Sequence, residues 1–359
     1  MQAFLLLDDG TRFYGTHFGA LESTMGEVVF STSMSGYQEG ITDPSYYGQI
    51  LVLTYPLIGN VGANDIDSES KKVSIKGLII KELCEVPSNW AVQESLEKFM
   101  KRHHIVGIKD IDTRALVLKI RNGVMKGMIC LEEPSKDQVK KLKNFKIENP
   151  IEQVSTKKIW SLEGDKHGKH VAVLDFGVKE NMLRVLHNKG YNLTIFPAKT
   201  SAKSILAFKP DGLLLSNGPG NPSDNDEVIK NIQGLLGKLP IMGICMGHQL
   251  LALACGLECK KMQYGHRGIN QAVKDIKRNS VFITSQNHGY EIDPKSVGDN
   301  AEISHYSVND NSIEGLRYKK HPSFSVQFHP EACPGPIDTA YLFDDFFTMM
   351  EEFKNAKKK

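Results

Sequence analysis

The residues best suited to chemistry lie in the segment Gly243-Ile-Cys-Met-Gly-His-Gln249, which places a cysteine between two glycines. An apolar run at 239–242 precedes the segment, and a helix-forming run at 250–254 follows it. This order of strand, sharp turn and helix is typical of a nucleophile elbow, whose tight turn requires small residues two positions before and after the nucleophile. Cys245 would lie at the N-terminus of the helix, where free N–H groups stabilise negative charge. The alternative is a buried cysteine in an ordinary strand-to-helix turn, because free cysteine is often buried.

A cysteine nucleophile needs a general base, and the base needs a group that orients it. Both types of residue occur in the segment Phe324-Ser-Val-Gln-Phe-His-Pro-Glu331. Its alternating apolar residues predict a strand, in which residues i and i+2 point to the same side. We therefore expect His329 and Glu331 to project together, provided that the extended geometry persists through Pro330. They would then serve as the base and the orienting group for Cys245.

Together, these two segments resemble the triad-type (class I) glutamine amidotransferases. Two further segments, Leu213–Pro222 and Ser285–Tyr290, fit the same family, so the resemblance covers about residues 170 to 350. The N-terminal half resembles the small-subunit family of carbamoyl phosphate synthetases. The segments that carry this second resemblance are Gly26–Phe30, Thr32–Glu39, Thr42–Tyr46, Leu53–Gly62 and Gly107–Arg114. The combined resemblance spans nearly the whole chain.

The resemblance implies a role for each matching residue. Cys245, His329 and Glu331 would form the catalytic triad, and the N–H groups of Gly220 and Met246 would form the oxyanion hole. The implied L-glutamine site consists of Ser45, Gly218, Gly220, Met246, Gln249, Asn287, Gly289 and Tyr290. His248 and His288 have no catalytic part in the family, so we expect both to be structural. Taken alone, the Asn-Gly-Pro-Gly220 sequence is also consistent with a simple tight turn.

The function implied by the resemblance is that of a glutaminase subunit, which would release ammonia for a large subunit that makes carbamoyl phosphate from bicarbonate. The chain has no G-x-x-x-x-G-K-[ST] phosphate cradle. We therefore expect no cofactor in this chain, and ATP and Mg on the large subunit. The alternatives are the glutaminase component of another amidotransferase, or a γ-glutamyl hydrolase, and residues 1–150 argue against both. A non-catalytic scaffold is a third possibility, against which the intact triad argues. Whether the product serves arginine or pyrimidine synthesis stays open.

Composition excludes several other classes of protein. A net charge of +2 over 359 residues is no electrostatic footprint for nucleic acid. No apolar run approaches the ~20 residues of a membrane span, and the N-terminus lacks a signal-peptide pattern. Six cysteines in a chain of this length do not make a disulfide framework, so we expect a cytoplasmic protein. We also expect no metal site, because no second ligand pair completes a set with Cys255 and Cys259.

The pattern of elements predicts an α/β protein with two domains. We expect an N-terminal β-rich α/β domain at residues 1–150, a linker at 151–169, and a doubly wound, mostly parallel sheet at 170–359. The N-terminal domain is predicted to have strands at 4–7, 27–32, 50–55 and 77–81, and helices at 95–103, 113–121 and 136–145. The C-terminal domain is predicted to alternate strands at 170–176, 192–196, 212–216 and 241–245 with helices at 179–189, 201–208 and 226–236. Sites in such sheets lie at the carboxyl ends of the strands, where Cys245 and residues 217–220 would converge.

Overall fold

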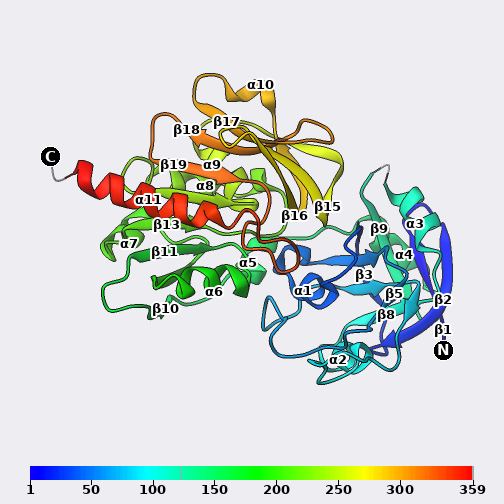
Figure 1. Cartoon of the computed structure of the whole chain (residues 1–359). Helices are drawn as coiled ribbons and strands as arrows, with labels where there is room; N and C mark the ends of the chain where they lie inside the picture. Colours follow the sequence, from blue (N-terminus) through cyan, green and yellow to red (C-terminus); the bar gives the residue numbers. More distant parts are fainter. Residues whose placement is uncertain (122, 358–359) are drawn as a thin grey trace. The chain divides into compact units, whose positions relative to one another are not determined.

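The computed structural model describes residues 1–121 and 123–357. The chain divides into two compact units, Met1–Pro150 and Ile151–Lys359, and Figure 1 shows the elements of each. The first unit is built around a β-barrel and the second around a large open sheet. The class of fold is therefore mixed α/β, as predicted.

Seven strands of the first unit form a closed barrel in the order β1-β2-β8-β6-β4-β3-β9. Closure leaves no strand of this barrel with an unpaired edge. The apolar side chains of Leu5, Ile50 and Ile79 are fully buried in one of its cores. The strands are β1 (Gln2–Leu7), β2 (Arg12–Gly19), β3 (Thr24–Ser31), β4 (Gln49–Leu53), β6 (Gly77–Ile79), β8 (Val106–Lys109) and β9 (Met125–Cys130).

The predicted helices of the first unit are confirmed, and each begins at a side-chain cap. Ser95, Asp112 and Ser135 each accept a hydrogen bond from a backbone N–H in the first turn, which satisfies one of the free donors of a helix start. The three helices are α2 (Leu96–Arg102), α3 (Thr113–Ile120) and α4 (Lys136–Lys143). Shorter elements are α1 (Tyr37–Thr42), the 3-10 turn η1 (Pro44–Tyr46), and the strand pair β5 (Leu57–Ile58) and β7 (Glu82–Leu83).

The second unit contains a ten-stranded sheet in the order β10-β12-β11-β13-β14-β19-β18-β17-β15-β16. Its central strands run parallel, as predicted: β12 (Asn192–Pro197), β11 (His170–Asp175), β13 (Gly212–Leu215), β14 (Ile241–Ile244) and β19 (Ser323–Val326). The sequence did not predict the antiparallel strands on one side of this core. They are β18 (Ile313–Tyr318), β17 (Ala301–Ser307), β15 (Cys259–Asp275) and β16 (Ser280–Ile292).

Alternating residues of the central strands pack against helices on opposite faces of the sheet. Val171 and Val173 belong to a core with residues of α6 (Glu180–Asn188) and α11 (Tyr341–Ala356). Ala172 and Leu174 belong to a second core with residues of α7 (Ala202–Ala207), α8 (Asp226–Gln233) and α9 (Met246–Ala254). Both faces are thus apolar, which explains the unbroken hydrophobic strands of the sequence. The remaining helices are η2 (Pro222–Asp224) and α10 (Pro294–Val297). None of the helices described is long and apolar enough to cross a membrane.

Residues 151–169, which we expected to be a linker, form part of the second unit. The segment contains most of helix α5 (Pro150–Val154) and the strand β10 (Trp160–Leu162). Strand β10 pairs antiparallel with β12, with Trp160 opposite Ile195. The polar residues that suggested a linker lie on either side of β10, whose own residues are Trp160, Ser161 and Leu162.

Candidate active site

Cys245 occupies the sharp turn between β14 and α9, as the sequence predicted. Its backbone has φ 54° and ψ −106°, a conformation that L-residues rarely adopt. Such strain persists only where the surrounding structure enforces it, and it is concentrated at functional sites. The turn places the cysteine at the N-terminus of α9 with 2% of its surface exposed.

The two glycines around Cys245 are required by the close approach of neighbouring backbone. A Cβ atom on Gly243 would lie 2.6 Å from the carbonyl oxygen of Gly247. A Cβ atom on Gly247 would lie 2.2 Å from the carbonyl oxygen of Leu215 in the adjacent strand. These contacts are between backbone atoms, so flexible side chains cannot relieve them. The spacing of small residues that marked the elbow in the sequence therefore has a steric cause.

His329 and Glu331 meet, but not by the geometry that we predicted. Strand β19 ends at Val326, and residues 330–331 form a turn, so extended backbone does not persist through Pro330. The N–H of His329 instead donates to the carbonyl of Ser285, 2.9 Å away, and this bridge holds the histidine beside β16. The turn that follows brings Nδ1 of His329 to 2.7 Å from Oε1 of Glu331.

The His329–Glu331 pair is buried, since each residue is only 2% exposed. Burial opposes the charge on His329, but the Glu331 carboxylate and the nearby Cys245 thiol outweigh it and raise the pKa of His329. Nδ1 of His329 faces Glu331, and its Nε2 has no hydrogen-bond partner among the described residues. That nitrogen is therefore available for proton transfer.

Lys179 is a member of this site that the sequence analysis missed. It precedes α6 and is 2% exposed, and its Nζ donates to Oε1 of Glu331 at 3.2 Å and to the carbonyl of Ala332 at 2.6 Å. Burial would raise the pKa of the Glu331 carboxyl, but Lys179 and His329 outweigh burial and lower it. The only signal in the sequence was position, because Lys179 lies just beyond the carboxyl end of a central strand.

Three of the residues expected in the glutamine site, Asn287, Gly289 and Tyr290, lie on strand β16. Sγ of Cys245 lies 3.7 Å from the carbonyl oxygen of Asn287. Nε2 of Gln249, one helical turn after the cysteine, donates to the carbonyl of Tyr290 at 3.0 Å. These contacts tie the first turn of α9 to the segment from Asn287 to Tyr290, which includes Gly289. Helix and strand thus form one local arrangement around the thiol.

The glycine loop after β13 lies beside the elbow. The N–H of Gly247 donates to the carbonyl of Ser216 at 2.9 Å, which connects the start of α9 to the start of this loop. A Cβ atom on Gly218 would lie 2.3 Å from the carbonyl oxygen of Phe176, and Gly220 has φ +97°. Met246 is the first residue of α9. Two positions of the loop therefore require glycine, whatever else the loop does.

Ser45 belongs to the first unit, where it lies in η1 and is 8% exposed. Its N–H donates to the carboxylate of Asp43 at 2.8 Å, an ordinary cap of a short helical turn.

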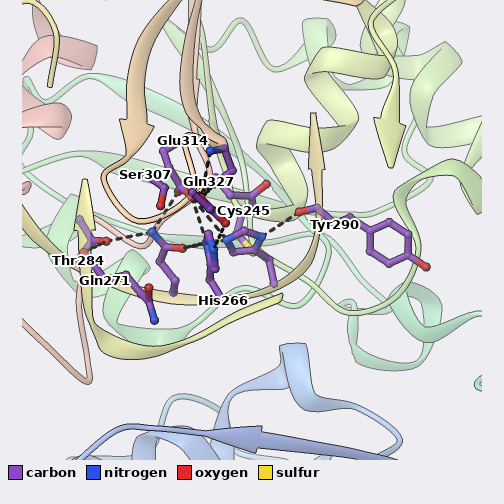
Figure 2. A network of polar contacts seen from close by, with 12 residues as sticks. Cys245, His266, Gln271, Thr284, Tyr290, Ser307, Glu314 and Gln327 are labelled. Carbon is purple, nitrogen blue, oxygen red and sulfur yellow. Dashed lines mark hydrogen bonds and ion pairs between the residues drawn. The ribbon is translucent and has the colours of Figure 1, made fainter. Parts of the chain in front are cut away.

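The remaining histidines of these segments are buried among polar groups. Nδ1 of His248 lies 2.8 Å from the hydroxyl of Ser325, and burial lowers the pKa of His248 to about 3. His288 joins His266 and Glu314 in a group whose ligand-type atoms all lie within 4.8 Å of one another. Figure 2 shows the polar network to which this group belongs. The sequence analysis expected no metal site and did not consider this group.

The second unit has the fold and the elbow of a class I glutamine amidotransferase. The family model for glutamine amidotransferase class-I matches residues 172–349. The model for the carbamoyl-phosphate synthase small chain, CPSase domain, matches residues 5–129. The two matches together cover most of both units.

Curated relatives match along nearly the whole chain. The carbamoyl phosphate synthase small chain of Clostridium perfringens is 49% identical over 96% of this chain and 99% of its own length. The carbamoyl phosphate synthase pyrimidine-specific small chain of Bacillus subtilis is 48% identical over 98% of this chain and 96% of its own length. The chain belongs to the carbamoyl phosphate synthase small-chain family. A glutaminase component of a different synthase is not favoured, because the relatives match the first unit as well as the second.

Proposed function

We propose that the chain is the glutamine-hydrolysing subunit of a carbamoyl phosphate synthase. It would release ammonia from L-glutamine and deliver it to a large, ATP-dependent subunit that makes carbamoyl phosphate from bicarbonate. The observation that carries this proposal is a cysteine in a strained elbow beside a buried His–Glu pair, in a chain that matches its relatives over both units. This arrangement has the three parts of a nucleophilic triad: nucleophile, base and orienting carboxylate.

The first chemical step is acyl transfer from the side-chain amide of glutamine to Cys245. The sulfur attacks the amide carbon, and the C–N bond breaks once the nitrogen has received a proton from Nε2 of His329. Ammonia leaves, and a γ-glutamyl thioester remains on the cysteine. Glu331 holds Nδ1 of the imidazole at 2.7 Å and stabilises the charged ring before this proton is transferred.

The second step is hydrolysis of the thioester. His329, now neutral, takes a proton from water, and the resulting hydroxide attacks the acyl carbon. The C–S bond breaks, so that glutamate leaves and the thiolate of Cys245 is regenerated beside the protonated His329. The same histidine therefore acts first as an acid and then as a base. Its Nε2 gives up and takes up the proton, while Nδ1 stays hydrogen-bonded to Glu331.

Substrate binding is assigned by the same family resemblance. The N–H groups of Gly220 and Met246 would stabilise the oxyanion that forms in both steps. The other groups that would hold glutamine are Ser45, Gly218, Gln249, Asn287, Gly289 and Tyr290. The contacts of Gln249 with Tyr290 and of Cys245 with Asn287 support the part of this assignment that lies in the second unit. ATP and Mg are assigned to the large subunit, because the sequence of this chain has no P-loop motif.

A glutaminase assay on two cysteine variants tests the proposal. Cys245→Ser, which replaces the thiolate by a far weaker nucleophile, is expected to abolish measurable hydrolysis of L-glutamine. Cys84→Ser is the matched control, because Cys84 lies in the first unit and its thiol contacts only the carbonyl of Val86 among the interactions described. Unchanged turnover in Cys245→Ser would overturn the assignment of the nucleophile.

A further inference from the structure

A second group of polar residues, none of them a member of the triad, lies between strands β15, β16 and β18. It consists of His266, Gln286, His288 and Glu314, and Asp310 contacts the outer nitrogen of His266. Figure 2 labels His266 and Glu314 of this group. We propose that this group binds one divalent transition-metal ion of the Zn²⁺ class. His266, His288 and Glu314 would supply three ligands, and the amide oxygen of Gln286 would supply the fourth.

The contacts of the two histidine rings carry the proposal, because every ring nitrogen faces the oxygen of a carbonyl, an amide or a carboxyl group. Nδ1 of His288 lies 2.8 Å from the carbonyl oxygen of Tyr290, and its Nε2 lies 2.9 Å from Oε1 of Gln286. Nε2 of His266 lies 2.9 Å from a carboxylate oxygen of Asp310. Its Nδ1 lies 2.9 Å from the same Oε1 of Gln286 and 3.2 Å from Oε1 of Glu314.

A neutral imidazole has one N–H group and one lone pair. If the outer nitrogens hold their protons for Tyr290 and Asp310, both inner nitrogens direct lone pairs toward the amide oxygen of Gln286. Turning the amide of Gln286 over resolves this conflict only with a proton on Glu314. Its Nε2 donates to Oε2 of Glu314 at 3.1 Å, and the inverted amide would place an oxygen against that carboxylate. The arrangement needs a proton on each inner nitrogen, a proton on Glu314 together with an inverted amide, or one cation between the rings.

We favour one metal ion over two protonated rings in this buried group, because a single ion can bind both inner nitrogens. Two protonated rings would have to lie edge to face with centroids 5.0 Å apart and share a single amide oxygen. A single metal ion would instead be bound by both lone pairs and by two oxygens. The ligand-type atoms of the two histidines and Glu314 lie within 4.8 Å of one another. In a tetrahedral site with Zn-ligand bonds of ~2.0 Å, neighbouring ligand atoms are about 3.3 Å apart. Small side-chain movements would bring the ligand atoms of this group to that spacing.

The outer contacts are those that metal sites use to fix their ligands. A ligating histidine usually donates its other N–H to a carboxylate or a backbone carbonyl. Asp310 serves His266 in this way, and the carbonyl of Tyr290 serves His288. The hydroxyl of Ser312 lies 2.8 Å from Oδ1 of Asp310 and 3.3 Å from Oε1 of Glu314, so it donates mainly to Asp310 and orients that outer carboxylate. Two imidazoles with two oxygens suit Zn²⁺ better than Mg²⁺, which prefers oxygen ligands alone.

Charge and access are also consistent with a cation. Glu314 is fully buried and contributes a carboxylate to the group. The side chain of Asp310 adds a second carboxylate and is 44% exposed, whereas that of His266 is 11% exposed. An ion could therefore enter past Asp310. With four protein ligands and no open position, the metal would be structural, and the proposal does not depend on glutamine hydrolysis.

Metal binding to the full chain tests the proposal directly. We would strip a Cys245→Ala chain with a chelator, so that the reactive thiol cannot compete, and titrate it with Zn²⁺ by calorimetry, with Mg²⁺ in parallel. One equivalent of Zn²⁺ and no Mg²⁺ are expected to bind. Glu314→Gln and His266→Gln are expected to weaken binding at least tenfold, as even changes in the outer contacts of metal sites do. His187→Gln, a change far from the group in sequence, is the control and should bind as tightly as the parent.

If those variants do not fold, the visible spectrum of bound Co²⁺ tests the proposal, because it reports which ligand types hold the metal. Co²⁺ bound to the Cys245→Ala chain is expected to give visible bands typical of nitrogen and oxygen ligands, without thiolate charge transfer, and Zn²⁺ should displace it. Asp310→Asn, which changes only an outer contact, should weaken Co²⁺ binding. The proposal is overturned if no stoichiometric binding occurs, if a thiolate band dominates, or if the variants bind as the parent does.

Discussion

At the residue scale, the candidate active site depends on how the charge of Glu331 is balanced. Its Oε1 lies 2.7 Å from Nδ1 of His329 and 3.2 Å from Nζ of Lys179. Burial disfavours the ionised carboxylate and each cationic neighbour favours it, so Lys179 and His329 together keep Glu331 ionised. The ionised carboxylate in turn stabilises the imidazolium of His329. The lysine thus supports the acid–base chemistry without touching the thiol in any contact described.

The first prediction concerns pH. Glu331→Gln keeps the shape of the side chain but removes the charge that raises the pKa of His329. Because a carboxylate favours the protonated ring, its loss must lower that pKa. The basic limb of the pH profile of kcat/KM for glutamine should therefore move to lower pH, and kcat should fall. Glu258→Gln, which changes an exposed carboxylate, is the control. A basic limb that stays in place would show that Glu331 does not set the protonation of His329.

The second prediction concerns stability. Lys179→Met removes one partner of a buried ion pair and leaves the carboxylate of Glu331 less well compensated. Breaking such pairs typically costs about 3–5 kcal/mol, which should be visible as a lower urea midpoint. Lys199→Met is the matched control, because Lys199 forms exposed ion pairs with Glu152 and Glu227. The urea midpoint of this control should be almost the same as that of the parent. Equal midpoints for the two variants would contradict the structural role of Lys179.

At the scale of elements, the sequence predicted what local patterns determine and missed what long-range packing determines. The strand–helix alternation from His170 to Ala254 was predicted because the strands are unbroken apolar runs and the segments between them have helical periodicity. The pairing of β15 with β16 was not predicted, because β15 is mostly polar and its register with β16 is interrupted by bulges. The meeting of His329 and Glu331 was expected for the wrong reason, since a turn brings them together. The burial of Lys179 depends on contacts some 150 residues away in the chain, which no local pattern encodes.

The third prediction tests the elbow as an element. Gly247→Ala would place a Cβ atom 2.2 Å from the carbonyl oxygen of Leu215, so β13 and α9 must separate. Overpacking of this kind costs about 1–3 kcal/mol, and the free energy of unfolding in urea should fall by at least that amount. Gly40→Ala is the control, because nothing lies within 4 Å of the added atom in α1. Turnover should fall as well, since the shift would displace Cys245. A Gly247→Ala chain with parental stability would show that the elbow has more room than the structure indicates.

At the scale of the whole molecule, the chain joins a barrel unit to an amidotransferase unit. Its relatives match both units, so the first unit is part of what distinguishes this family from other glutamine amidotransferases. The sequence has no G-x-x-x-x-G-K-[ST] motif, and in the proposed function the ammonia passes to a large subunit. The division of labour with a large subunit is therefore the property of the whole molecule that most needs a test.

The fourth prediction separates the two activities of such a complex. The tagged chain should copurify from its native extract with a large ATP-binding protein, and the complex should make carbamoyl phosphate from either glutamine or ammonia. In the complex with Cys245→Ala, the glutamine-dependent reaction should be lost, because no thioester can form. The ammonia-dependent reaction should persist, because it bypasses this chain. Cys84→Ser should retain both. Loss of both reactions in Cys245→Ala would mean that the chain does more for the synthase than supply ammonia. Copurification with a different synthase would contradict the assignment to carbamoyl phosphate synthesis.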